Sequence, residues 1–164
     1  MIDNCKAESQ ADSGGSIMYD PVPIMLVEDD AVDAAAATRA LKELKINGSL
    51  IHLTNGQEAL AYLQDDNNIK PALIVADIHM PHMTGLEFLH AVKQDPNLQE
   101  LPVIVLSSSE KSEDKDLAFS YGAAGYIVKP VSYEQLLEAL KSFKDYWSPN
   151  ELPSADQQPE SAGV

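Results

Sequence analysis

The chain has 164 residues, a size that suits one ordinary domain with a hydrophobic core of its own. Its formal net charge is −15, with 26 Asp and Glu against 11 Lys and Arg. This charge disfavours nucleic-acid binding, which needs a basic surface, and attachment to an anionic membrane surface. The apolar fraction of 45% is typical of a globular protein, and no apolar run approaches the length of a membrane span.

The two ends of the chain differ in composition from its middle. Residues 1–21 are rich in Asp, Ser and Gly, and residues 148–164 in Pro, Ser, Gln and Glu, so we expect both to be disordered tails. Each tail carries a formal charge of −3, which leaves −9 on residues 22–147. The first residues lack the basic start and apolar stretch of a secretory signal, and the single cysteine, Cys5, can form no internal disulfide. We therefore expect a cytoplasmic protein with one folded domain, residues 22–147.

Short apolar runs alternate with helix-like segments along residues 22–147. Runs typical of buried strands occupy 23–27, 49–54, 72–77, 101–107 and 124–129. Helices are predicted between and after these runs, over 31–44, 56–64, 86–94, 112–122 and 133–147. The alternation predicts a doubly wound α/β domain, with a five-stranded parallel sheet and helices on both faces. The strand order 2-1-3-4-5 is one of the two common arrangements of such a sheet.

Local signals predict how several helices begin, end and pack. Asn55 and Ser132 each precede a helix and are followed three residues later by Glu or Gln, the pattern of a capping box. Gly122 at the end of the fourth helix is typical of a C-cap. The apolar positions of the first helix are Val32, Ala36, Ala40 and Leu44. Those of the last helix are Leu136, Leu137, Leu140, Phe143 and Trp147.

Polar residues stand at the ends of the strands, where an open parallel sheet binds its ligands. In the order 2-1-3-4-5, the carboxyl ends of the first, third, fourth and fifth strands are neighbours. They carry acids, a hydroxyl and an amine: Glu28, Asp29, Asp30, Asp77, Ser107 and Lys129. Clustered carboxylates need a cation among them, and Mg²⁺ takes oxygen ligands from carboxylates and from a phosphate. Because serine and lysine donate to phosphoryl oxygens, this crevice is predicted to be a phosphoryl site.

Four segments at these strand ends resemble the signatures of the response-regulator receiver domain of two-component signalling, a CheY-like form of this fold. They are VEDD (27–30), VADIHMP (75–81), VLSSS (105–109) and YIVKP (126–130). The resemblance extends from about residue 22 to residue 147. Asp95-Pro96-Asn97 and Tyr146-Trp147 further resemble the small single-domain regulators that partner bacterial phytochromes.

The resemblance implies that Asp77 is the phospho-acceptor. Its carboxylate would take a phosphoryl group from a sensor histidine kinase, for which the finer resemblance implies the phytochrome type, or from a phosphotransfer protein. The implied metal is Mg²⁺, or Mn²⁺, held by Glu28, Asp29, Asp77 and the backbone carbonyl of His79.

The resemblance also implies a switch around this acceptor. Ser107 and Lys129 would contact the phosphoryl group, Tyr126 would move inward when Ser107 turns toward it, and the bond before Pro130 would be cis. Phosphorylation would shift an equilibrium between two states and change contacts with partners or with a second copy. The expected contact face is formed by the last two helices and the fifth strand. Such a protein is no enzyme beyond its own phosphotransfer and dephosphorylation.

The residues alone leave several assignments open. Asp30, with Asp33 three residues later, is either a metal ligand or the N-cap of the following helix. Asp77 by itself is also compatible with a turn residue, because aspartate is common in turns. Ser108 and Ser109 are interpreted as small polar loop residues.

Two alternative functions were weighed. A pseudo-receiver would bind partners without ever being phosphorylated, but the intact set of acids, serine and lysine speaks against it. A Mg²⁺-dependent aspartyl-phosphate phosphatase would carry D-x-D on the first strand and a cap domain, whereas this strand reads VEDDAVD.

The pair His79 and His82 has the spacing H-x-x-H, which without further ligands is a weak zinc pattern.

Overall fold

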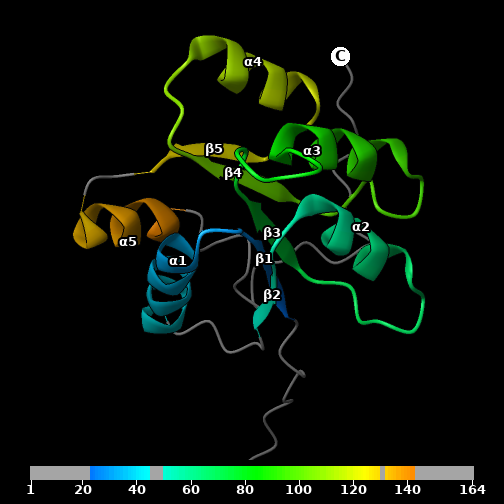
Figure 1. Ribbon diagram of the computed structural model, residues 1–164, viewed down its shortest axis with the longest axis horizontal. Coiled ribbons are helices and arrows are strands. Elements are labelled where there is room, and N and C mark those ends of the chain that lie inside the picture. The colour runs from blue at the N-terminus through cyan, green and yellow to red at the C-terminus, as the bar shows by residue number, and fades with distance from the viewer. Residues whose placement is uncertain (1–22, 45–49, 130–131, 143–164) are drawn as a thin grey trace, which may run out of the picture.

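The computed structural model describes residues 23–44, 50–129 and 132–142, which form a five-stranded parallel sheet covered by helices (Figure 1). The elements in chain order are β1 (Ile24–Val27), α1 (Ala31–Glu43), β2 (Leu50–Leu53), α2 (Gly56–Gln64), β3 (Leu73–Ala76), α3 (Gly85–Gln94), β4 (Val103–Ser107), α4 (Ser112–Ser120), β5 (Gly125–Val128) and α5 (Tyr133–Lys141). The strands lie in the order β2-β1-β3-β4-β5, which confirms the predicted arrangement. No helix within the described ranges is long and apolar enough to cross a membrane.

The central strands β1 and β3 are continuous apolar runs, and β4 is one up to Ser107, because both faces of the sheet are covered there. Every residue of β1, β3 and β4 is buried, whereas the edge strands β2 and β5 are partly exposed. All four strand pairs are parallel, and Ile24 of β1 is in register with Leu50 on one side and Leu73 on the other. The middle position of β3 therefore places its carboxyl end at the centre of one edge of the sheet.

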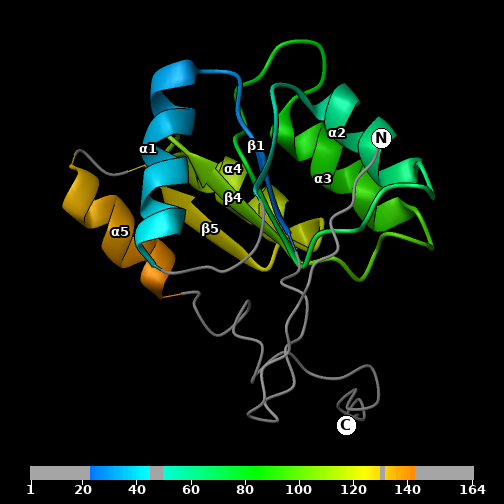
Figure 2. The same cartoon turned by 90° about the horizontal axis from the view of Figure 1, so that it is seen from below.

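The helices divide between the two faces of the sheet (Figures 1 and 2). α1 and α5 cover one face, over a buried cluster that includes Leu26, Val75 and Leu140. α2, α3 and α4 cover the other face, over a second cluster that includes Ile74 and Phe88. Figure 2 shows α1 beside α5 on one side of the strands and α2 beside α3 on the other. Each face thus has its own core, with the sheet as the shared wall.

The predicted N-caps are present, but neither forms the full capping box, because the side chains of Glu58 and Gln135 do not bond back to the N-cap backbone within the described residues. The Asn55 side chain accepts the N–H of Glu58 at 2.8 Å, and the Ser132 hydroxyl accepts the N–H of Gln135 at 3.2 Å. Gly122 follows α4 with a φ of 101°, a left-handed conformation that glycine adopts at low cost. These local signals fix where the helices begin and end.

The predicted apolar positions of α1 are wrong in part. Val32 is 77% exposed, and Ala36 is only partly buried. The residues that α1 buries are Ala34, Ala37, Ala40 and Leu41. An alanine-rich helix has small apolar side chains on several faces, so its sequence gives little contrast between the buried and the exposed side.

The last helix is described only as far as Lys141, with Ser142 as its C-cap, whereas the sequence predicted a helix over 133–147. Leu136 and Leu140 are buried as expected. Phe143 and Trp147 lie outside the described residues, as do the tails 1–21 and 148–164.

Candidate functional site

The ends of β1, β3 and β5 bring the predicted site residues to one edge of the sheet. Asp77 follows β3, and its N–H donates to the carbonyl of Val27 at 3.0 Å. Glu28 follows β1, and its N–H donates to the last residue of β2 at 3.0 Å. Lys129 follows β5, and its N–H donates to the carbonyl of Ser107 at 2.7 Å. Each backbone is thus held by the sheet for one residue beyond its strand, which fixes where the side chains start.

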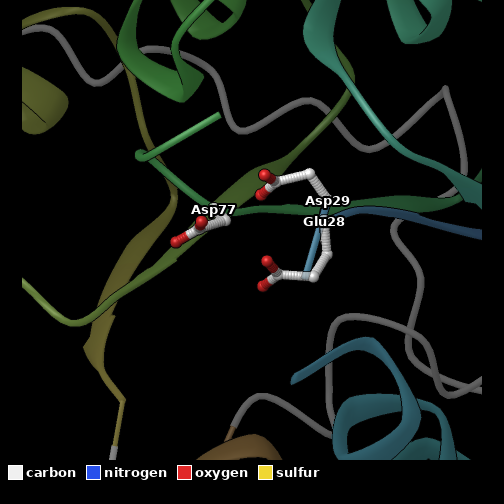
Figure 3. A group of neighbouring side chains, drawn as sticks. All are labelled: Glu28, Asp29 and Asp77. Atoms are coloured by element: carbon white, nitrogen blue, oxygen red, sulfur yellow. The ribbon is translucent and has the colours of Figure 1, made fainter. Parts of the chain in front are cut away.

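Three carboxylates lie close together at this edge (Figure 3). One oxygen each of Glu28, Asp29 and Asp77 lies within 4.8 Å of the other two. Glu28 and Asp77 are 2% and 5% exposed, whereas Asp29 is exposed. Figure 3 shows Glu28 and Asp29 extending from the end of β1 toward Asp77. A set of hard oxygen ligands with one open side fits Mg²⁺ or Mn²⁺, which bind carboxylates and keep some of their water.

The two buried carboxylates lack full compensation. Burial raises the pKa of Asp77 above its ordinary value, and Lys129 offsets this rise only in part. Burial likewise raises the pKa of Glu28; its hydrogen bond to Lys129 acts against this, and the Asp77 charge adds to it. Asp77 Oδ1 is buried and has no hydrogen-bond partner within the described part of the chain. A buried oxygen of this kind is costly, and a divalent cation at this place would remove the cost.

Lys129 is the cation of the site, and it is shared unequally among the acids. Its Nζ lies 2.7 Å from Asp33 Oδ2 and 2.9 Å from Glu28 Oε1, but 3.4 Å from Asp77 Oδ1. The last distance exceeds the usual range of an N–H···O hydrogen bond. Burial alone would lower the pKa of Lys129, but the hydrogen bonds to Asp33 and Glu28 outweigh it and raise the pKa. Lys129 therefore stays charged.

Asp33 belongs to this site although the sequence did not single it out. It lies in the first turn of α1, where an acid is expected for the helix alone, because carboxylates stabilise helix N-termini. Its carboxylate nevertheless reaches Lys129 at the end of β5, nearly one hundred residues later. No local pattern signals such a contact; it follows from the packing of α1 beside α5 over the same face of the sheet.

The open question of Asp30 is resolved by its hydrogen bonds. Its Oδ1 accepts the N–H groups of Val32 and Asp33, both at 2.9 Å, so Asp30 is the N-cap of α1. Its carboxylate serves the helix and does not join the acids around Asp77. Glu28 and Asp29 are thus the two acids after β1 that face Asp77.

On the other side of Asp77, a hydrogen-bond network centres on Ser109. Ser107 is fully buried, and its Oγ accepts the N–H of Ser109 at 3.1 Å. The Tyr126 hydroxyl donates to the Ser109 carbonyl at 3.0 Å, and the Ser109 hydroxyl donates to Asp114 of α4 at 2.5 Å. Ser109, interpreted from sequence as a plain loop residue, therefore connects Ser107, Tyr126 and α4.

The loop between β3 and α3 holds Asp77 closely. A Cβ on Gly85 would lie 2.0 Å from the Asp77 carbonyl oxygen, so only glycine fits there. The Gly85 N–H donates to the Ile78 carbonyl at 2.9 Å. Thr84 and Glu87 form a full capping box at the start of α3, a T-x-x-E signal that the sequence analysis missed.

Two predicted features of the site stay predictions. His79 lies in this loop two residues after Asp77 with its side chain exposed, and its carbonyl remains a predicted metal ligand. Pro130 lies outside the described residues, and so does the predicted cis bond before it. The pair His79 and His82 is not part of the acidic group that the described residues form.

Comparisons with known sequences agree with this geometry. Residues 24–141 match the response regulator receiver domain. The chain is 33% identical over 131 residues to the probable methanogenesis regulatory protein FilR2 of Methanothrix harundinacea, covering 78% of this chain and 84% of that protein. It is 31% identical over 131 residues to the response regulator Rcp1 of Synechocystis, covering 77% of this chain and 89% of that protein.

Solved structures show the same fold. The Mn²⁺-bound form of Rcp1 matches this chain with a TM-score of 0.71 at 31% identity. The match covers 77% of this chain and 94% of the Rcp1 chain. The phosphorylated cyanobacterial phytochrome response regulator RcpA has a TM-score of 0.71 at 32% identity, with coverages of 77% and 93%. The bacteriophytochrome response regulator AtBRR has a TM-score of 0.66 at 29% identity, with coverages of 79% and 97%. The matched sequence, the shared fold and the acids at the strand ends agree, and the chain belongs to the response regulator receiver domain family.

Proposed function

We propose that this protein accepts a phosphoryl group on Asp77 in a Mg²⁺-dependent reaction and then changes its contacts with other proteins. The observation that carries the proposal is the buried Asp77 carboxylate, whose Oδ1 has no hydrogen bond within the described residues. It stands at the open end of the central strand and faces Glu28 and Asp29. A carboxylate with free lone pairs, close to a fixed ammonium and to metal-binding acids, is suited to act as a nucleophile.

In the proposed transfer, an Asp77 oxygen attacks the phosphorus atom of a phosphohistidine on a sensor histidine kinase or a phosphotransfer protein. The new O–P bond forms as the P–N bond breaks, and the histidine nitrogen leaves with the bonding electron pair. A divalent cation held by Glu28, Asp29, Asp77 and the His79 carbonyl would supply positive charge beside the phosphoryl oxygens. Lys129 adds a second positive charge from the end of β5.

Ser107 is the proposed hydrogen-bond donor to the bound phosphoryl group. Its Oγ accepts the N–H of Ser109, which leaves its own O–H free to donate within the described residues. When Ser107 turns toward the phosphoryl group, Ser109 loses a hydrogen-bond acceptor. Tyr126 is bound to the Ser109 carbonyl, so this shift would reach Tyr126 and the helix α4.

The proposed output is a protein contact over α4, β5 and α5. Leu117 and Phe119 on α4 and Val128 on β5 are large apolar side chains that are 40%, 46% and 41% exposed. This face lies next to the network around Ser109, so a rearrangement there would change its shape. A partner protein or a second copy of this chain is the proposed binder.

The relatives support these details. One is a Mn²⁺-bound form and another a phosphorylated form, and two are named as phytochrome response regulators. On this basis we propose a phytochrome-type kinase as the donor. Residues 22–147 as the receiver unit, acidic tails on either side and a place in the cytoplasm are parts of the same proposal. The chemistry is limited to the transfer to Asp77 and the later loss of the phosphate.

Intact mass after incubation with acetyl phosphate and Mg²⁺ tests the proposal. The wild type is expected to gain one phosphoryl group, whereas Asp77→Asn and the wild type in EDTA are expected to gain none. Ser108→Ala serves as a matched control, because Ser108 is exposed at the same strand end. A folded wild type that gains no mass from acetyl phosphate or from a phosphorylated phytochrome-type kinase would make the chain a binding scaffold.

A further inference from the structure

The position of Lys129 differs from the one that its proposed task requires. A lysine that binds a phosphoryl group on Asp77 should point at Asp77, yet its Nζ makes its shortest contact with Asp33, at 2.7 Å. The distance to Asp77 Oδ1 is 3.4 Å, and that oxygen receives no hydrogen bond from the described residues. The ammonium is therefore paired more closely with Asp33 and Glu28 than with Asp77, the acid that it would serve.

A phosphoryl group on Asp77 would compete with Asp33 for this ammonium. Lysine has three N–H groups, and two of them point at Asp33 and Glu28 in this structure. Glu28 is also one of the three acids that fit a cation, so Asp33 is the partner of Lys129 that serves no metal. The contact with Asp33 is thus the one that Lys129 gives up to reach a phosphoryl oxygen.

The surroundings leave room for this change. Asp33 and Lys129 line a cavity of about 190 Å³ between α1, β4 and α5, whose other walls include Ala36, Leu106 and Leu136. The Asp33 side chain is 46% exposed, whereas that of Lys129 is 16% exposed. The carboxylate of Asp33 can therefore regain water when Lys129 leaves it, so no buried charge is left unpaired.

We propose that Asp33 is a positioning residue that holds Lys129 off Asp77 in the resting protein and so weakens the binding of a phosphoryl group. This inference rests on the proposed function of Asp77 as the phospho-acceptor. The ion pair between Asp33 and Lys129 is lost on phosphorylation. The lost pairing energy makes the phosphorylated state less stable relative to the resting state. For a half-exposed pair this corresponds to about a two- to fivefold effect on an equilibrium constant.

Fluoroberyllate, a non-covalent mimic of a phosphoryl group, tests this idea by calorimetric titration at saturating Mg²⁺. The variants are Asp33→Asn, which removes the charge at nearly constant shape, and Asp33→Glu, which keeps a carboxylate in reach of Lys129. Asp30→Asn is the matched control, because it removes one negative charge from the start of the same helix and asparagine preserves the N-cap. Thermal unfolding of each variant checks that the fold is intact.

We expect Asp33→Asn to bind fluoroberyllate about two to five times more tightly than Asp30→Asn, and Asp33→Glu to bind like the wild type. Equal affinity of Asp33→Asn and Asp30→Asn would reduce the effect to long-range charge and overturn the inference. Weaker binding by Asp33→Asn would overturn it too, because Asp33 would then be aiming Lys129 at the phosphoryl group. A wild type that binds no fluoroberyllate would contradict the proposed function itself. If the wild type binds, differences in fluoroberyllate affinity between the variants bear on the role of Asp33 alone.

Discussion

Two loops near Asp77, the one from β3 to α3 and the one from β4 to α4, are held in place in different ways. The loop from β3 to α3 is fixed by close packing: Gly85 sits against the Asp77 carbonyl, and Thr84 caps the helix. The loop from β4 to α4 is fixed by hydrogen bonds through Ser109. α3 buries Phe88, Leu89 and Val92, whereas the buried residue of α4 is Ala118. The loop from β3 to α3 is thus anchored by core packing, whereas the loop from β4 to α4 is held mainly by hydrogen bonds.

This difference separates the two tasks that the site is proposed to perform. A nucleophile needs a backbone that stays in place, and the packed loop supplies it. A switch needs an element that moves at little cost, and segments with few buried contacts are those that open most easily. The N-cap residue of α4, Lys111, makes no side-chain cap, so the first turn of α4 is tied to the loop mainly by the hydrogen bond between Ser109 and Asp114.

The largest effect is expected from removing the anchor of α3. Phe88→Ala deletes a fully buried ring and should lower the free energy of unfolding by about 3–5 kcal/mol. Phe119→Ala on α4 is the matched control, because its ring is 46% exposed and its loss should change stability by about 0.5 kcal/mol or less. Urea unfolding measures both. Similar losses in the two variants would mean that α4 is anchored as firmly as α3.

Gly85→Ala should come next, at about 3 kcal/mol, because its Cβ would meet the Asp77 carbonyl and the backbone must move. Gly122→Ala after α4 places its Cβ 3.4 Å from the Lys93 side chain, an ordinary contact. Its cost arises from the positive φ alone and should be about 1–2 kcal/mol. Thermal unfolding of both variants distinguishes a clash from a strained dihedral, and a milder effect at Gly85 would show that this loop can yield.

The sequence predicted those features that depend on the sheet. Buried strands and intervening helices predict a doubly wound parallel sheet, for which 2-1-3-4-5 is one of two common strand orders. In that order, the residues after the first, third, fourth and fifth strands are neighbours. The sequence therefore predicts that Glu28, Asp77 and Lys129 lie together. Their positions follow from topology alone, because each lies one residue past a strand whose end the sheet fixes.

The features that the sequence missed depend on side-chain packing between distant elements. Predicting the contact of Asp33 with Lys129 requires knowing how far α1 lies from the end of β5. Predicting the hydrogen bonds of Ser109 requires knowing the path of the loop between β4 and α4. The buried face of α1 was misplaced because alanines surround that helix. The capping box of Thr84 and Glu87, in contrast, depends on local sequence alone, because T-x-x-E before an apolar stretch is typical of a helix start.

A smaller effect is expected from removing the charge of Asp77, which the loop from β3 to α3 holds in place. In metal-free protein, Asp77→Asn should raise the free energy of unfolding by on the order of 1 kcal/mol, because it removes a buried carboxylate that is only partly compensated. The raised pKa of Asp77 fixes the pH dependence. The folded state binds this proton more tightly than the unfolded state, so wild-type stability falls as pH rises from the ordinary value of 3.8 through the folded value.

The advantage of Asp77→Asn should therefore be complete above the raised pKa of Asp77 and shrink as pH falls toward the ordinary value of 3.8. Thermal unfolding in EDTA across this range measures it. Added Mg²⁺ should reverse the order, because the wild type offers one more carboxylate to the cation and gains more from binding. An Asp77→Asn variant that is less stable than the wild type in EDTA would show that Lys129 compensates the carboxylate fully.

The smallest change tests the loop that is held by hydrogen bonds. Tyr126→Phe removes the donor to the Ser109 carbonyl and leaves the ring in place, so global stability should fall by only about 0.5–1 kcal/mol. The local effect should be larger and confined to one side of the site. Amide hydrogen exchange is expected to speed up over residues 108–111 and at the start of α4, and to stay unchanged over residues 78–85. The packing of Phe88 and Gly85 holds the second segment without the Tyr126 hydroxyl, and the variant keeps the ring that packs against this core. Equal acceleration in both loops would therefore mean that they open together, and that no difference exists between a fixed and a movable loop.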